Sequence, residues 1–109
     1  MLKYFAIFVG VVSALSASAS QAATSAFCES VRNYALTTME ARQAGASYEK
    51  LSLDVEINFR EDEKLRTLLI SIIGGAFLED RQTTKAAQAA AVNAYGRAWY
   101  HSCVWFMVS

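Results

Sequence analysis

The stretch KAAQAAAVNAYGRAWYHSCVWF, residues 85–106, decides the fold. Alanine is the strongest helix former, and no proline interrupts this or any other part of the chain. Asp80, Thr83 or Thr84 can cap the first turn of such a helix. We therefore predict a long last helix, whose larger apolar residues share one side at three- and four-residue steps: Val92, Tyr95, Trp99, Cys103 and Phe106.

The first residues of the chain have the layout of a signal peptide. Lys3 gives a positive start, YFAIFVGVVSAL is an apolar run, and SASASQAA supplies small residues for cleavage. We predict a leader over residues 1–22 and one domain over residues 23–109, with cleavage after Ala19 as the alternative. The apolar run is shorter than the ~20 residues of a membrane span. The sequence thus predicts a periplasmic or secreted protein.

The two cysteines, Cys28 and Cys103, lie near the two ends of the predicted domain. Two cysteines with none left over, in a small exported domain, indicate one disulfide. This bond closes a loop of about 75 residues, which the chain-entropy model values at about 4 kcal/mol. It also predicts that the first and last helices lie side by side and antiparallel, with Val31 near Trp99 or Tyr100 and Ala35 near Gly96.

A reactive thiol and a metal site are the alternatives for Cys103, because His101 lies two residues away. Positions two apart in a helix point about 200° away from each other, so these side chains do not face a common centre. Zinc also needs about four ligands, and the chain has no second histidine. We therefore expect no catalytic residue, no metal and no cofactor.

Three further segments fit a helical protein. Residues 25–44 have a helical period, a cap at Thr24 or Ser25, and Gly45 placed to end the helix in a left-handed turn. Residues 61–80 carry a core-facing apolar stripe behind an acidic first turn. In that stripe, Gly74 and Gly75 favour a close approach by another helix, with a bend or hinge as the alternative.

Residues 51–59 are ambiguous. Their apolar residues alternate strictly, which is a strand signal, yet no other segment offers a partner strand. We favour a short helix from Tyr48, followed by an irregular stretch; a helix here leaves Leu53 and Ile57 on its outer face. If the segment is extended instead, it can pair with a second copy and form a homodimer. The predicted fold is an all-α bundle of three or four helices.

Composition restricts the partners. Ten basic and ten acidic residues balance, and loss of Lys3 with the leader leaves nine against ten. Nucleic-acid binders carry a concentrated basic surface, so we expect no nucleic-acid partner. The end of the last helix is apolar on all sides, which fits either a central helix covered on every side or a partner-contact patch. The residues of this candidate patch are Trp99, Trp105, Phe106 and Met107.

The chain resembles a loose group of short exported helical proteins of Gram-negative bacteria. The residues that carry the resemblance are an early and a late cysteine, an A-R-Q-x-G-x-S junction between helices (Ala41, Arg42, Gln43, Gly45 and Ser47), and an A-Y pair in the last helix (Ala94 and Tyr95). The resemblance covers most of the predicted mature domain and implies its location and fold, but no activity. Periplasmic acid-stress chaperones share the architecture, although the cysteines here lie much farther apart.

The sequence therefore predicts a non-enzymatic exported protein that binds an unknown protein partner. The alternatives are a periplasmic inhibitor or immunity protein, an acid-stress chaperone, and a protein whose aromatic C-terminal tail inserts at a membrane interface.

Overall fold

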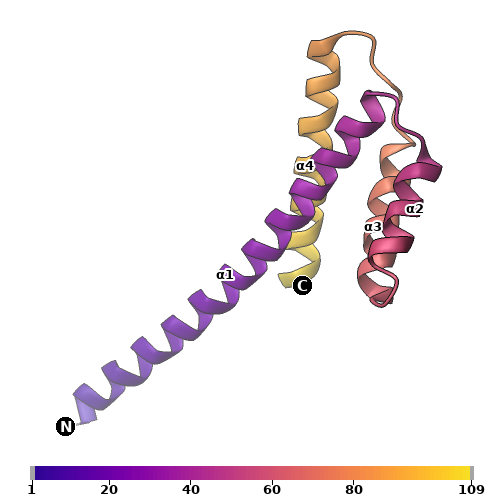
Figure 1. Ribbon diagram of the computed structural model, residues 1–109. Coiled ribbons are helices and arrows are strands. Elements are labelled where there is room, and N and C mark those ends of the chain that lie inside the picture. The colour runs from indigo at the N-terminus through magenta and orange to yellow at the C-terminus, as the bar shows by residue number, and fades with distance from the viewer. Residues whose placement is uncertain (1, 109) are drawn as a thin grey trace.

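The computed structural model describes the backbone of residues 2–108 and the side chains of residues 21–107. In chain order these residues form α1 (Leu2–Gln43), α2 (Tyr48–Asn58), α3 (Glu63–Ala76) and α4 (Lys85–Val108). Helix α4 lies along the C-terminal part of α1, and α2 and α3 stand beside them as a hairpin (Figure 1). The predicted all-α bundle is confirmed.

The predicted disulfide is present and joins α1 to α4. The sulfurs of Cys28 and Cys103 are 2.15 Å apart, and the two Cα atoms are 5.6 Å apart. Farther along α1 and farther back along α4, Gly96 lies directly against the side chain of Leu36. Residues of increasing number in α1 therefore contact residues of decreasing number in α4, which confirms the antiparallel pairing. The residue that faces Gly96 is Leu36, next to the predicted Ala35.

Helix α1 begins earlier than the sequence predicts. Thr24 and Ser25 do not cap a helix start, because one continuous helix runs from Leu2 to Gln43. The leader is rich in alanine, serine and long apolar residues and has no proline, so nothing in it stops a helix. The other end is as predicted: Gly45 has φ 98°, and the Ala46 N–H donates to the Ala41 carbonyl in a Schellman motif.

Helix α2 settles the ambiguous segment in favour of a helix. The Ser47 hydroxyl accepts from the Lys50 N–H and caps the helix, which continues to Asn58. Val55 is buried, whereas Leu53 and Ile57 are exposed on the outer face as predicted. The extended alternative is wrong, and with it the route to a dimer through strand pairing.

Helix α3 provides the centre of the core. Leu69, Ile72 and Ile73 of α3 form one core cluster with Val31 and Ala35 of α1 and Val55 of α2. Ala76, in the last turn of α3, is also buried. Asp62 caps α3 by accepting from the Leu65 N–H at 3.0 Å. The predicted close approach occurs at Gly75, where a Cβ would overlap the Tyr95 hydroxyl, but not at Gly74, which faces open space.

Helix α4 begins after Thr84, whose hydroxyl accepts from the Ala87 N–H at 3.1 Å. Tyr95 and Trp99 pack against the core and contact each other edge to face, with ring centroids 6.4 Å apart. Phe106 does not follow them into the core, contrary to the predicted stripe, and its side chain is exposed. The hairpin of α2 and α3 leaves the last turns of α4 without a cover.

Candidate interaction surface at the disulfide end

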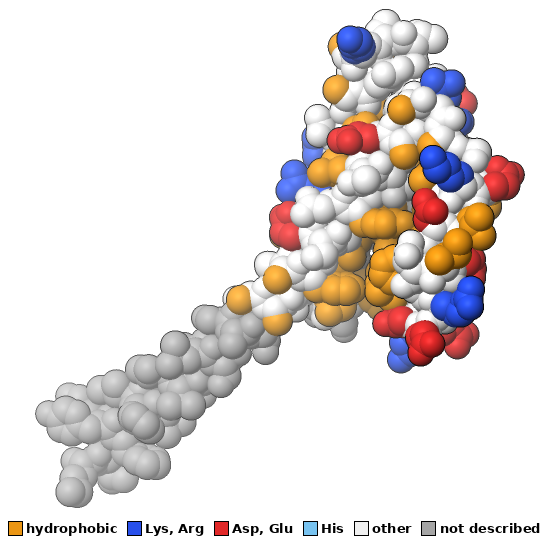
Figure 2. All heavy atoms as spheres, in the orientation of Figure 1, with side chains coloured by type: hydrophobic (Ala, Val, Ile, Leu, Met, Phe, Trp, Pro, Cys, Tyr) orange, Lys and Arg blue, Asp and Glu red, His pale blue; other side chains and the backbone are white. Residues whose placement is uncertain are grey.

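The two ends of the bundle differ in chemistry. We call the end that holds the disulfide the aromatic end and define it by Phe27, Trp99, Trp105, Phe106 and Met107. We call the other end the junction and define it by residues 42–47 and 77–84. Hydrophobic side chains gather in the hollow between α1 and the α2–α3 pair, toward the lower end of the bundle (Figure 2).

An apolar groove of about 460 Å³ opens at the aromatic end. Helix α1 contributes Phe27 and Val31, and α3 contributes Leu68. The remaining lining comes from the last turns of α4: Trp99, Ser102, Cys103, Phe106 and Met107. A groove of this size and character is typical of a binding site rather than of a packing defect.

The side chains around the groove are unusually exposed for their size. The exposed fraction is 83% for Phe106, 75% for Trp105, 49% for Met107 and 44% for Phe27. Trp99 differs from them, because it is half-buried against the core and forms the inner wall. Of the four residues of the predicted patch, Trp105, Phe106 and Met107 are therefore exposed, and Trp99 is half-buried.

The geometry of a helix explains this exposure. Successive residues point about 100° apart, so Trp105, Phe106 and Met107 face three directions. Helix α1 covers only the side of α4 that carries Cys103, whose bond to the buried Cys28 fixes that orientation. No arrangement of one covering helix buries all three side chains, and an exposed apolar cluster of this kind marks a contact surface.

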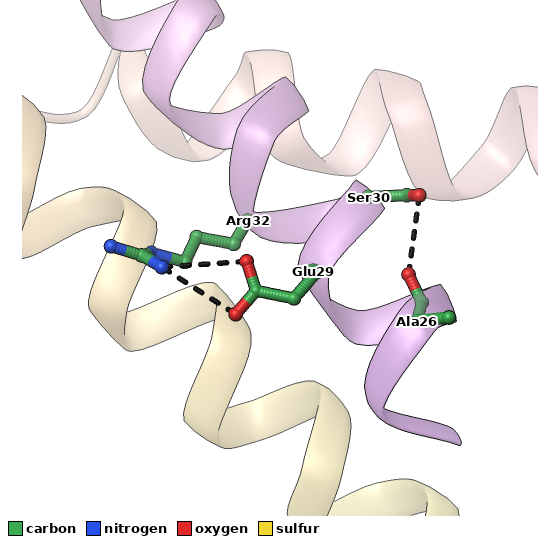
Figure 3. A network of polar contacts seen from close by, with 4 residues as sticks. All are labelled: Ala26, Glu29, Ser30 and Arg32. Carbon is green, nitrogen blue, oxygen red and sulfur yellow. Dashed lines mark hydrogen bonds and ion pairs between the residues drawn. The ribbon is translucent and has the colours of Figure 1, made fainter. Parts of the chain in front are cut away.

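Charge is sparse on the α1 and α4 segments of the aromatic end. Residues 21–28 carry no charged side chain, and residues 98–107 contain no lysine, arginine, aspartate or glutamate. The last turns of α4 do carry Tyr100 and His101, and the exposed His101 ring contacts the Tyr100 ring. The nearest ion pair joins Glu29 and Arg32 of α1 at 3.4 Å, and both lie beside α4, while Ser30 points to another side (Figure 3). The two charges of this pair compensate each other.

The disulfide predicted for Cys103 is present. Cys103 is bonded to Cys28, so it offers no thiol to a substrate or a metal. Within residues 2–108, no three histidine, cysteine or carboxylate side chains stand close enough together to hold a metal ion.

At the junction, by contrast, polar side chains form hydrogen bonds across the fold. Gln43 is almost completely buried, and its amide accepts from the Gln82 N–H at 2.7 Å and donates to the Asp80 carbonyl at 3.0 Å. The Arg42 guanidinium donates to the Glu79 carbonyl at 3.3 and 3.2 Å. These contacts fasten the loop between α3 and α4 to the end of α1.

The remaining contacts of the junction also stabilise the fold locally. The Arg42 guanidinium lies over the Phe77 ring, 4.9 Å from its centroid. Gly45 supplies the positive φ, and Arg81 packs over it while donating to the Gln43 carbonyl. The sequence pattern drew attention to this motif, but it did not reveal Gln43 as the buried centre of the loop contacts.

Two tyrosines outside the aromatic end are titratable groups in a partly buried setting. Burial raises the pKa of Tyr95, whose hydroxyl donates to the Ile72 carbonyl across the contact between α3 and α4. Burial also raises the pKa of Tyr34, which lies in a groove of about 250 Å³ between α1 and α2. Both hydroxyls thus remain protonated at neutral pH and serve packing.

Comparison of the chain with protein-family models, with curated proteins and with solved structures gives no match. Across residues 2–108, no helix joins the length and the apolar character that crossing a membrane demands. The resemblance to short exported helical proteins stays a prediction.

Proposed function

We propose that this chain is an exported, non-enzymatic protein that acts by binding another polypeptide through the aromatic end. The observation that carries the proposal is the coincidence of the apolar groove with three large exposed side chains: Trp105, Phe106 and Met107. Protein interfaces concentrate binding energy in aromatic anchors of this kind, surrounded by surface with few charges.

Export is supported by the position of the packed domain within the chain. Among the described side chains of α1, Cys28 is the first that is buried, and residues 21–27 are exposed or half-exposed. Cleavage after Ala22 therefore removes no described core residue. A disulfide that ties both ends of the domain together fits an oxidising compartment. N-terminal sequencing of the protein from a periplasmic fraction tests this step, and Ala23 is the expected first residue.

A non-enzymatic role is supported by the way the chemistry-bearing residues are used. The cysteines form the disulfide, Asp62 caps α3, and the polar groups of the junction hold a loop. His101 is exposed and has a tyrosine ring, rather than an acid or a nucleophile, as its neighbour. These roles are structural, and they account for the residues that drew attention in the sequence.

Photo-crosslinking tests the binding role. A crosslinking phenylalanine analogue at position 106, in cells that export the protein, should give a discrete adduct with a polypeptide. The matched control places the analogue at Leu78, which is 88% exposed and lies at the junction. No adduct at position 106, or the same adducts at both positions, would contradict the proposal.

A membrane-interface role is the second candidate, and the direction of α1 favours it. The N-terminal part of α1 extends beyond the other helices at the aromatic end (Figure 1). Trp105 and Phe106 thus lie close to where the apolar leader leaves the folded domain, and aromatic side chains favour such interfaces. Flotation of the processed protein with neutral phospholipid vesicles would support this role, and loss of flotation in Phe106→Ser would assign it to the same surface.

A further inference from the structure

The two cysteines of the disulfide differ in their surroundings. Cys28 is completely buried, with 0% of its surface exposed. Cys103 is partly exposed and lines the apolar groove of the aromatic end, whereas Cys28 is not among the residues that line this groove. One side of the bond is therefore accessible from solvent, and the other side is covered by the fold.

The places of the two cysteines in their helices explain this difference. Cys28 begins the buried side of α1, because Val31, one turn farther along, belongs to the core cluster. Cys103 lies one turn after Trp99, near the uncovered end of α4, and the exposed Trp105 and Phe106 follow it closely. The packed core thus shields Cys28, and the open end of α4 leaves Cys103 accessible.

This asymmetry has a chemical consequence. A disulfide exchanges when a thiolate attacks one of its two sulfurs, and access is one factor that decides which sulfur is attacked. Here the thiolate of an external thiol forms a bond to the Cys103 sulfur, and the bond between Cys103 and Cys28 breaks. The electron pair of the broken bond leaves on the Cys28 sulfur, which takes up the proton that the external thiol released.

The lining of the groove restricts the kind of thiol that reacts. Its side chains are apolar apart from Ser102. A charged thiol loses hydration in such surroundings without gaining an opposite charge, whereas a small uncharged thiol loses little. The groove therefore favours small uncharged thiols.

From these observations we propose that Cys103 is a modification site for small uncharged thiols and that Cys28 is its buried resolving cysteine. The product of the first step is a mixed disulfide on Cys103 and a free thiol on Cys28. The Cys28 thiolate then attacks the Cys103 sulfur, expels the external thiol and restores the original bond, since the fold places the two Cα atoms 5.6 Å apart. The proposal goes beyond the binding role and does not depend on it.

Reaction of the folded, oxidised full chain with mercaptoethanol tests the proposal. Acid stops the exchange by protonating the thiolates, and pepsin digestion in acid followed by mass spectrometry locates the adduct. We expect about tenfold more adduct on Cys103 than on Cys28, and comparable amounts on the two cysteines in urea. An adduct mainly on Cys28, or equal amounts on the two cysteines of the folded chain, would overturn the proposal.

Mercaptoethanesulfonate is the matched charged thiol. It should react several-fold more slowly than mercaptoethanol with the folded chain, and the two thiols should react at similar rates in urea. Equal rates with the folded chain would overturn the assignment of the site to uncharged thiols.

Two single variants test the roles of the cysteines separately. With dithiodipyridine, Cys103 in Cys28→Ser should react about tenfold faster than Cys28 in Cys103→Ser, and urea should abolish the difference. The adduct in Cys28→Ser should persist, whereas the reduced unsubstituted chain should end as the disulfide. Equal rates for the two variants, with circular dichroism that shows both folded, or an adduct that persists equally in the unsubstituted chain, would contradict the assigned roles. The reaction of the oxidised chain needs neither variant, so it decides the proposal even where a variant does not fold.

Discussion

The junction and the aromatic end are built from the same two helices, α1 and α4 with their neighbours, yet they use their side chains in opposite ways. At the junction, the Arg42 guanidinium and the Gln43 amide form hydrogen bonds to backbone groups of the following loop. At the aromatic end, Trp105, Phe106 and Met107 face outward. The comparison teaches that a distinctive motif and a functional surface need not coincide, because the motif here serves the fold.

The largest expected effect concerns the bond beneath the aromatic end. Replacing both Cys28 and Cys103 by serine should lower the free energy of unfolding by about 4 kcal/mol, because the unfolded chain loses a cross-link that closes a 75-residue loop. Urea denaturation measures the loss, and hydrogen exchange should show the two bonded helix ends opening first. Ser102→Ala is the control. If both variants were equally stable, the disulfide would not be what holds the two ends of the domain together.

The next effect tests the junction. Gln43→Ala should destabilise the protein by about 2 kcal/mol, since the Gln82 N–H and the Asp80 carbonyl lose their partner in a buried position. Gln88→Ala, which removes a single hydrogen bond to the Gln82 carbonyl, is the matched control and should cost about half as much or less. Thermal unfolding measures both. Equal losses would show that Gln43 is not the centre of the loop contacts.

Two adjacent glycines of α3 differ in their surroundings: Gly75 faces Tyr95, and Gly74 faces open space. Gly74→Ala should stabilise α3 by about 0.5 kcal/mol or more, because its Cβ meets nothing and alanine favours a helix. Gly75→Ala should be less stable than Gly74→Ala by about 1 to 2 kcal/mol, because its Cβ displaces the Tyr95 hydroxyl from the Ile72 carbonyl. Chemical denaturation of the two variants measures this difference in stability. If Gly75→Ala were the more stable variant, the close approach would not be at Gly75.

The smallest effect is a dependence on alkaline pH. Burial raises the folded-state pKa of Tyr95, so the neutral hydroxyl contributes stability that is fully present below pH 10 and is lost as pH rises through the raised pKa. Tyr95→Phe should cost about 1 kcal/mol at pH 7. Above pH 10 it should lose less stability than the unsubstituted protein. Denaturation curves at pH 7, 9 and 11 measure the difference, and parallel losses would contradict this assignment. Tyr34→Phe, at the other tyrosine with a raised pKa, is the companion variant.

Much of the fold could be predicted from the sequence because its determinants are local. The alanine-rich stretch, the apolar period of residues 61–80 and the glycine at position 45 each specify a helix or its end. The pairing of Cys28 with Cys103 followed from their number and then set the topology. The predicted start of α1 was wrong. A cap residue ends a helix only where the residues before it are not helical, and here the preceding residues continue the helix.

The candidate surface was accessible to sequence reasoning only in part. An apolar run around the whole circumference of a helix shows that some residues are exposed, but it does not show which. Phe106 was predicted both on the side of the last helix that carries Trp99 and Cys103 and in the partner-contact patch, and only the tertiary structure shows that its side chain is exposed. Gln43 was missed as the centre of the junction for the same reason, since its partners lie nearly forty residues away.

The most direct test of the contrast between the two ends uses two methionines of one sample. Met39 is fully buried beside Gln43, and Met107 is half exposed at the aromatic end. Their rates of oxidation by hydrogen peroxide, read by peptide mass spectrometry, report access to each end. We predict rapid oxidation of Met107 and a slow rate for Met39, because only Met107 is exposed. Equal rates for the two methionines would contradict this account.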